Sequence, residues 1–234
     1  MSLLTDFGAR SRTRRSAADS VGRPLDLISL HVPKAFGTSL CEVLARHYGR
    51  RRVVRDYSRF LEDPGSAKGP GLGPVLPTSA AVLHGHFPAT RYASVPAHRR
   101  VTFLREPIQR TISHYFFWLT APKHGNPVHD RMLDDSLGLL DFAALPTIRR
   151  FYTETIFGGC DMVSFDLVGV VEDLERDWPL FQHLTGIQAP LPHVNRNRYP
   201  GYAGIAARVM GDQTLMRTLR RVLDDDIRFY ERFL

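Results

Sequence analysis

The sequence of 234 residues predicts an α/β fold in which helices cover both faces of a central parallel sheet, giving three layers. Short apolar segments, typical of buried strands, alternate along the chain with longer segments whose apolar residues recur at helical spacing. This alternation indicates parallel pairing, because a crossover between parallel strands usually contains a helix. Hydrophobic residues make up 43% and charged residues 24% of the chain, which is the balance of a globular protein.

The chain divides into a short arm and one domain. Residues 1–22 are polar, rich in Arg and Ser and without hydrophobic periodicity, so we expect a flexible arm there. Residues 23–234 have the length of a single α/β domain and contain no internal repeat.

The first half of the domain is predicted to contain three strands. The first, at 25–30, is followed by a polar segment and a helix. The segment at 62–79 holds four Gly and four Pro residues and is predicted to be a surface loop or a mobile flap. Strands at 80–83 and 100–104 follow. The latter runs into a helix at Pro107, where the missing N–H has no cost in the first turn.

The second half is predicted to contain one more strand among helices. The expected elements are a helix at 137–157, a strand at 166–171, a helix at 172–185 that contains Pro179, a polar loop at 190–204 and a long amphipathic helix at 212–233.

The net charge of +7 suggests an anionic partner. Only three of the 31 basic residues are lysines, and arginines cluster at 10–15 and 50–55. Nucleic-acid binding is one interpretation, but the sequence holds no DNA-binding or RNA-binding signature and no zinc-finger spacing. We therefore interpret the clusters as solvated arginines and expect no nucleic-acid partner.

Other classes are excluded by what the sequence lacks. No run of about 18 consecutive apolar residues occurs, so no membrane span is predicted. No secretory signal is recognisable at the N-terminus, and we expect a cytoplasmic protein. Cys41 and Cys160 are too few for a disulfide framework or a thiolate zinc site, so we interpret them as small apolar side chains.

Polar residues follow three predicted strands, at 31–39, 84–86 and 105–113. Ligands of open α/β sheets bind outside the carboxyl ends of the strands. The three segments therefore predict a single crevice.

The segment at 31–39 has the composition of an anion-binding loop. Gly37 lets the backbone approach an anion, Thr38 and Ser39 open a helix whose free N–H groups favour negative charge, and Lys34 adds a cation. The loop of nucleotide kinases has Gly-Lys-Ser/Thr in direct succession, whereas this lysine precedes the glycine by three residues. The alternative is a helix N-cap at Thr38 or Ser39 with an incidental lysine.

Several segments together resemble the carbohydrate sulfotransferases. The segment at 31–40 (HVPKAFGTSL) resembles their 5′-phosphosulfate loop and the segment at 103–115 (FLREPIQRTISHY) their 3′-phosphate motif. The segment at 84–88 (HGHFP) lies between them, as in the uronyl and heparan sulfate 2-O-sulfotransferase branch, and the segments at 168–172 and 191–195 resemble further landmarks. The ordered set covers about residues 26–232.

This resemblance implies a P-loop-like fold and the donor 3′-phosphoadenosine 5′-phosphosulfate. Carried over by position, the donor-binding residues would be Lys34, Gly37, Thr38 and Ser39 at the 5′-phosphosulfate, Arg105 and Ser113 at the 3′-phosphate, and Arg196 and Arg198 in a loop that closes over the nucleotide. The alternative for Arg196 and Arg198 is a solvated loop. A guanidinium offers paired N–H donors to phosphate, which suits Arg105. The alternative for Arg105 is a surface ion pair with Glu106 or another nearby carboxylate.

The segments also depart from the family pattern. Ala35 stands where the family usually has Thr, which removes one hydroxyl donor to the phosphates, and Glu106 stands where Asp is usual. Phe36 replaces a small residue, so we expect it to crowd the loop or to pack against the purine.

The two histidines of the middle segment are candidates for the chemistry. The resemblance implies that His86 is the general base, and an imidazole with a pKa near neutrality suits removal of a hydroxyl proton. The alternative is a structural histidine. His84 is expected to contact the substrate or to support His86. An isolated His-x-His on a strand would also suit a metal, but no third ligand is evident, and we expect no metal.

The predicted function is sulfuryl transfer to an acceptor hydroxyl, on a carbohydrate or a glycosylated small molecule, with His86 as base and Lys34 stabilising the departing phosphate oxygen. A P-loop nucleotide or small-molecule kinase is one alternative, and would need a magnesium-binding carboxylate. A non-catalytic anion-binding or nucleic-acid-binding protein is another.

Overall fold

In the part of the chain that the structure describes, five parallel strands form one sheet in the order β2-β3-β1-β4-β5. The computed structural model describes residues 23–57, 76–123, 125–192 and 199–234. The strands are β1 (Leu27–Leu30), β2 (Val53–Asp56), β3 (Val82–Gly85), β4 (Arg100–Leu104) and β5 (Leu167–Val170). The central strand β1 pairs with both β3 and β4, which places the ends of these three strands side by side. The predicted α/β class with a parallel sheet is confirmed.

Successive side chains of the strands enter two different cores. Leu27 and Val82 pack on one face of the sheet, against the helices α1 (Gly37–Tyr48) and α6 (Leu174–Thr185). Ile28 and Leu83 pack on the opposite face. Since side chains alternate along a strand, a strand that is apolar at every position must be covered on both faces.

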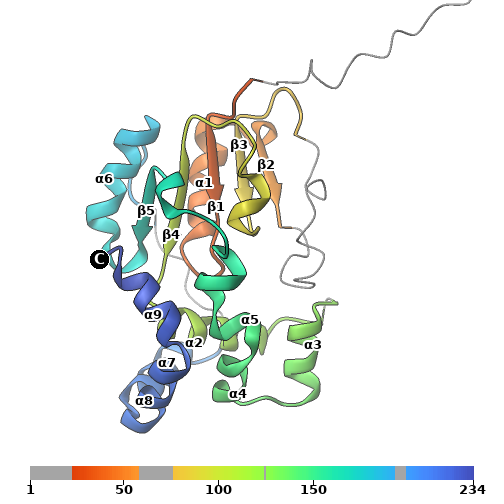
Figure 1. Cartoon of the computed structure of the whole chain (residues 1–234), viewed down its shortest axis with the longest axis vertical. Helices are drawn as coiled ribbons and strands as arrows, with labels where there is room; N and C mark the ends of the chain where they lie inside the picture. The colour runs from red at the N-terminus through yellow and green to blue at the C-terminus, as the bar shows by residue number, and fades with distance from the viewer. Residues whose placement is uncertain (1–22, 58–75, 124, 193–198) are drawn as a thin grey trace, which may run out of the picture.

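The second face is covered by shorter elements and by the last helix. They are η4 (Ala89–Tyr92), the π-helical turn η5 (Phe151–Ile156) and α9 (Asp224–Glu231). The remaining helices gather beyond the carboxyl ends of the strands, at the bottom of Figure 1. They are α2 (Pro107–Trp118), α3 (Pro127–Asp134), α4 (Leu139–Ala144), α5 (Pro146–Arg149), α7 (Tyr202–Gly211) and α8 (Gln213–Val222).

The single helix predicted at 137–157 is wrong. The structure has α4, α5 and η5 there, because Leu145 precedes Pro146 and adopts an extended backbone with ψ of 135°. A residue before proline is pushed out of the helical region by contact with the proline ring. A second break lies at Arg150, whose φ of −120° and ψ of 50° are not helical.

The long helix predicted at 212–233 is interrupted at Leu223, where φ is −102° and ψ is 15°, so that α8 ends and α9 begins. Three aspartates then occupy the first turn of α9, and negative charge is favourable at a helix N-terminus. The polar loop predicted at 190–204 is also shorter than expected, because α7 begins at Tyr202.

The structure adds a strand that the sequence pattern did not predict. We interpreted the arginines at 50–55 as solvated, and β2 occupies 53–56 of that segment as an edge strand. Val53 and Asp56 of β2 are buried whereas Arg55 is exposed, so the alternation of β2 is masked by its charged residues.

Some predictions concern segments outside the described residues. The arm at 1–22 lies there, as does most of the Gly- and Pro-rich segment. Within the described part of the chain, no helix combines the length and the hydropathy that a membrane crossing requires.

Candidate functional site

The loop between β1 and α1 has the geometry of an anion-binding turn. Lys34 and Phe36 both adopt left-handed backbone conformations, with φ of 69° and 65°. The turn is closed by a hydrogen bond from the Ala35 N–H to the Val32 carbonyl, at 3.0 Å. Thr38 and the buried Ser39 lie in the first turn of α1, as predicted, and Gly37 is its first residue. The alternative of an N-cap at Thr38 or Ser39 is wrong, because Phe36 is the N-cap residue. Because the first N–H groups of a helix have no partner within it, this end of α1 can receive an anion.

Gly37 is required by a close contact within this loop. A Cβ at this position would lie 1.7 Å from Cδ2 of His31, so the imidazole of His31 occupies the space that any side chain would need. The glycine therefore allows His31 to pack directly against the start of α1.

Phe36 packs into the core. Its ring lies 5.3 Å from that of Phe103 and 5.9 Å from that of Trp178, and only 6% of the residue is exposed. The prediction that Phe36 packs against the purine is not supported by this placement. Instead, Phe36 anchors the loop to the sheet and to α6.

Arg105 leaves the carboxyl end of β4 and turns toward the β1 loop. Its Nη1 donates to the Lys34 carbonyl at 3.4 Å, and its Nε lies 4.0 Å from Glu172. The backbone of Arg105 is fixed by Tyr152, whose hydroxyl accepts from the Arg105 N–H at 3.1 Å and donates to its carbonyl at 2.6 Å. The predicted pair, Lys34 and Arg105, is therefore brought together from two neighbouring strands.

Lys34 and Arg105 place two positive charges at the same edge of the sheet. Burial, together with the charge of Arg105, lowers the pKa of Lys34 to about 8. Both effects disfavour the ammonium form, and an anion bound between the two side chains would relieve the repulsion.

The helix after Arg105 begins as the sequence predicts. Pro107 is its first residue, and the Glu106 carboxylate caps it by accepting from the Ile108 and Gln109 N–H groups at 3.1 and 2.7 Å. Ser113 lies on this helix and is 3% exposed. The substitution of Glu for the usual Asp at 106 thus preserves the cap.

Three histidines gather at the carboxyl ends of β1 and β3. The ring of His31 lies 4.3 Å from that of His86 and 5.3 Å from that of His84. Tyr57, which follows β2, packs edge-on against His86 at 4.8 Å, and its hydroxyl lies 3.3 Å from His31 Nδ1. Of these four residues, only His84 and His86 were predicted to be site residues.

The histidines are held in the neutral form. Burial lowers the pKa of His86 to about 3, with a further decrease from His84, and burial lowers the pKa of His84 to about 4. Burial also lowers the pKa of His31 well below its ordinary value. The pKa near neutrality that was expected for His86 is therefore wrong: at pH 7 its imidazole is neutral and keeps a lone pair on one ring nitrogen, but it is a weaker base than an exposed histidine.

His84 and His86 differ in their surroundings. His84 is fully buried, and its Nδ1 lies 2.9 Å from the Ser29 hydroxyl. The predicted contact between His84 and a substrate would therefore require neighbouring rings to move. His86 is partly exposed as a residue, but the Nε2 atoms of both histidines are buried and have no hydrogen-bond partner within the described residues.

Glu172 and Tyr152 also lie at the candidate site, although neither was predicted to be a site residue. The Glu172 carboxylate accepts from the Glu106 N–H at 3.0 Å and from the Tyr230 hydroxyl at 2.9 Å, and it lies beside Arg105. Glu172 belongs to one of the segments that carry the family resemblance, which is a signal that it lies at the site. Tyr152 had no such signal, because it lies in a segment predicted to be an ordinary helix.

Arg196 and Arg198, predicted to close over a nucleotide, lie outside the described residues, as do 193–195 of the same motif. Within the described residues, no group of three or more His, Cys, Asp or Glu side chains has the geometry of a metal site.

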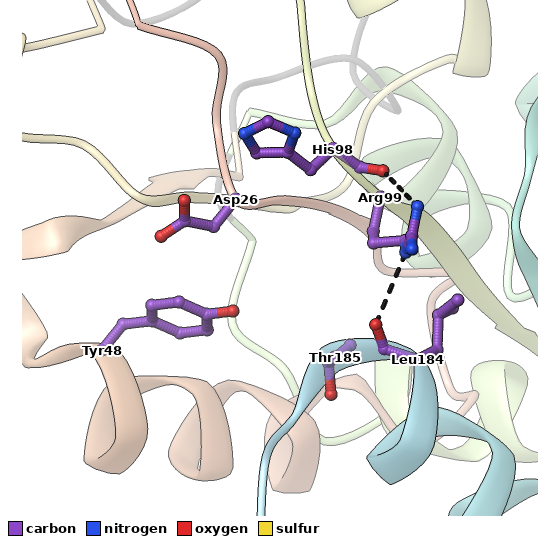
Figure 2. A pocket seen from close by; sticks show the side chains of 6 residues that line it. All are labelled: Asp26, Tyr48, His98, Arg99, Leu184 and Thr185. Atoms are coloured by element: carbon purple, nitrogen blue, oxygen red, sulfur yellow. Dashed lines mark hydrogen bonds between the residues drawn. The ribbon is translucent and has the colours of Figure 1, made fainter.

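A separate hollow lies at the opposite end of the sheet. It has a volume of about 460 Å³ and is lined by residues that precede β1 and β4 and by the C-terminal ends of α1 and α6 (Figure 2). In Figure 2 the Arg99 side chain bonds the Leu184 and His98 carbonyls, at 3.4 and 3.0 Å. The residues that line this hollow include none of the predicted site residues.

Comparison with known proteins gives similarities of fold. No family model and no curated protein matches this chain. Among solved structures, a sulfotransferase from Alicyclobacillus acidocaldarius is 16% identical, with a TM-score of 0.39, over 87% of this chain and 97% of that chain. The mouse sulfotransferase SULT7A1, complexed with PAP, is 13% identical, with a TM-score of 0.38, over 83% of this chain and 66% of that chain. At these values neither similarity carries the activity of those proteins over to this chain.

Proposed function

We propose that this protein is a sulfotransferase that uses 3′-phosphoadenosine 5′-phosphosulfate and an acceptor hydroxyl, on a carbohydrate or a glycosylated small molecule. One observation carries the proposal. Lys34, His86 and Arg105 follow the carboxyl ends of the adjacent strands β1, β3 and β4. Two cationic side chains that could bind an anion therefore lie at the same edge of the sheet as an imidazole whose Nε2 has no hydrogen-bond partner within the described residues. This is the edge at which open α/β sheets bind ligands.

The residues of this edge fit such a donor. The N-terminus of α1 and Lys34 would hold the 5′-phosphosulfate, and Arg105 with Ser113 the 3′-phosphate. The donor supplies the sulfuryl group. Arg196 and Arg198 are proposed to contribute from the C-terminal loop.

His86 is the proposed general base. Its Nε2 accepts the proton of the acceptor hydroxyl as the hydroxyl oxygen forms a bond to sulfur. The bond between sulfur and the phosphate oxygen breaks in the same step, and Lys34 stabilises the negative charge that develops on that oxygen. The rings of His31 and Tyr57 pack against the base, and His84 stacks on the far side of this group against His31.

Binding of nucleotides tests this proposal against its alternatives. We expect 3′,5′-adenosine bisphosphate to raise the melting temperature more than AMP does, with no requirement for Mg²⁺. A kinase would respond to Mg²⁺ and gain nothing from the 3′-phosphate. A general anion-binding protein would not distinguish the two nucleotides except by charge, and its binding would weaken strongly with salt. Either of the latter results would contradict a sulfotransferase.

Arg105 provides a sharper test of the donor site. Replacing Arg105 with Ala should weaken binding of 3′,5′-adenosine bisphosphate by about tenfold to a hundredfold, because a charged hydrogen-bond partner contributes about 1.5–3 kcal/mol. Isothermal titration calorimetry measures this loss, and Arg99→Ala, at the opposite end of the sheet, is the matched control. Unchanged affinity in Arg105→Ala would remove Arg105 from the site.

A further inference from the structure

The ammonium group of Lys34 contacts the face of an aromatic ring that has no role in the proposed function. Its Nζ is 4.1 Å from the centroid of Phe117, in the last turn of α2. A cation is attracted to the face of an aromatic ring at this distance. Phe117 is 40% exposed, so the ring is not placed there by burial in a core.

The other charged groups near Lys34 cannot hold its ammonium. Arg105 is positive and lowers the pKa of Lys34, and Lys34 in turn lowers the pKa values of His31, His86 and His114. Across residues 23–57, 76–123, 125–192 and 199–234, no carboxylate forms an ion pair with Lys34. The contact with Phe117 is thus the attractive interaction that the structure records for this charge.

Phe117 also lies on the side of α2 that faces the proposed donor site. Ser113, a proposed 3′-phosphate residue, precedes it by four residues, and residues at this spacing lie one turn apart on the same face of a helix. Lys34 therefore reaches from the β1 loop to the face of α2 that carries Ser113.

We propose that Phe117 is a positioning residue for Lys34: its ring binds the ammonium and holds that charge against α2, within reach of the anion site. The contact itself is independent of the activity. Its importance for sulfuryl transfer rests on the proposed function.

Amine labelling tests this contact directly. Only three lysines occur in the sequence, so peptide mass spectrometry resolves Lys34 from Lys68 and Lys123. We expect Lys34 in Phe117→Leu to react about two- to fivefold faster than in the parent at a fixed pH near 7, because loss of the ring lowers the pKa of Lys34 and raises the fraction of neutral amine. Phe117→Tyr, which keeps an aromatic face, should retain the parent rate.

Two controls exclude a structural origin. Leu119→Ala removes another exposed apolar side chain just beyond α2 and should leave the rate at Lys34 unchanged. Lys123, which pairs with Asp134 away from Lys34, is the internal reference within each sample. Equal rates at Lys34 in the parent and in Phe117→Leu, or a change at Lys123 as large as that at Lys34, would overturn the proposal.

The same experiment separates this inference from the proposed function. Adding 3′,5′-adenosine bisphosphate should slow labelling of Lys34 in the parent and in Phe117→Leu. A faster rate in Phe117→Leu without any protection by the nucleotide would support the contact with Phe117 and contradict the donor site.

Discussion

At the scale of single residues, the proposed role of His86 as general base is the most specific chemical prediction. An alcohol is a weak nucleophile at neutral pH, and a positioned base contributes about 10²–10⁴-fold in rate. His86→Ala should lose turnover by a factor of this size and still bind 3′,5′-adenosine bisphosphate, because the proposed donor contacts come from other residues. Turnover of a sugar acceptor and calorimetry with the nucleotide measure the two effects separately.

His84→Ala is the matched comparison for His86, since the two histidines lie on the same strand segment. If His84→Ala lost turnover while His86→Ala kept it, the base would be His84; if both kept it, the proposed mechanism would be wrong. The pH dependence also differs from that of an ordinary imidazole. Because burial lowers the pKa of His86 to about 3, we expect no loss of rate from this group near pH 6.5, where an exposed histidine becomes protonated.

At the scale of an element, the turn between β1 and α1 depends on one glycine. In Gly37→Ala, the new Cβ would meet the His31 ring, so either the ring or the turn must shift. We expect binding of 3′,5′-adenosine bisphosphate to fall at least tenfold, since a preorganised loop loses affinity when it is displaced.

A second substitution identifies the cause of that loss. His31→Ala combined with Gly37→Ala should recover most of the affinity, because the colliding ring is gone. Gly204→Ala is the control, since a Cβ at Gly204 meets nothing within 4 Å and alanine is the better helix former. Failure of the double variant to bind better than Gly37→Ala would contradict the steric explanation.

The elements that could be predicted from sequence are those whose signal is local. The strands at 27–30 and 100–104 are short apolar runs, and Pro107 marks the start of α2. The break at Leu223 could not be predicted, because the apolar spacing continues through it. Beyond the break, α9 is held by Asp226, whose carboxylate accepts from the Tyr152 and Thr153 N–H groups at 2.9 and 3.0 Å, more than 70 residues away in sequence.

In the candidate site, too, the residues that could be predicted are those with a local signal in the sequence. Lys34, His86 and Arg105 lie in motifs that can be recognised along the chain. His31 and Tyr57 gain their roles through ring contacts between β1, β2 and β3, and β2 itself was hidden by its arginines. Contacts between strands distant in sequence leave no periodic signal.

At the scale of the whole molecule, the buried histidines make stability depend on pH. In the unfolded chain a histidine binds a proton below its ordinary pKa of 6.5, whereas folded His84 has a pKa of about 4. The unfolded state therefore binds more protons between these values, and the free energy of unfolding should decrease as pH falls from about 6.5 to 4. For His84 alone the decrease is about 1.4 kcal/mol per pH unit.

Urea unfolding at pH 7, 6 and 5 measures this slope. His84→Gln should reduce the slope of the unfolding free energy against pH by the amount that corresponds to about one bound proton. His183→Gln, at an exposed position, is the control. A slope that is the same in His84→Gln and in the parent would show that His84 is not held neutral in the folded state.

Asp226 also links the assembly of this fold to its synthesis. Besides the two backbone bonds, Asp226 accepts from the Thr153 hydroxyl at 3.1 Å, and Phe229 and Tyr230 of the same helix complete the core that contains Leu104 and Val170. That core cannot close on a ribosome until Tyr230 has been made, although the strands it covers emerge much earlier. Nascent chains that stall before residue 226 would leave the aromatic rings of η5 without their cover from α9, and such exposed apolar surface makes an incompletely folded chain prone to aggregation.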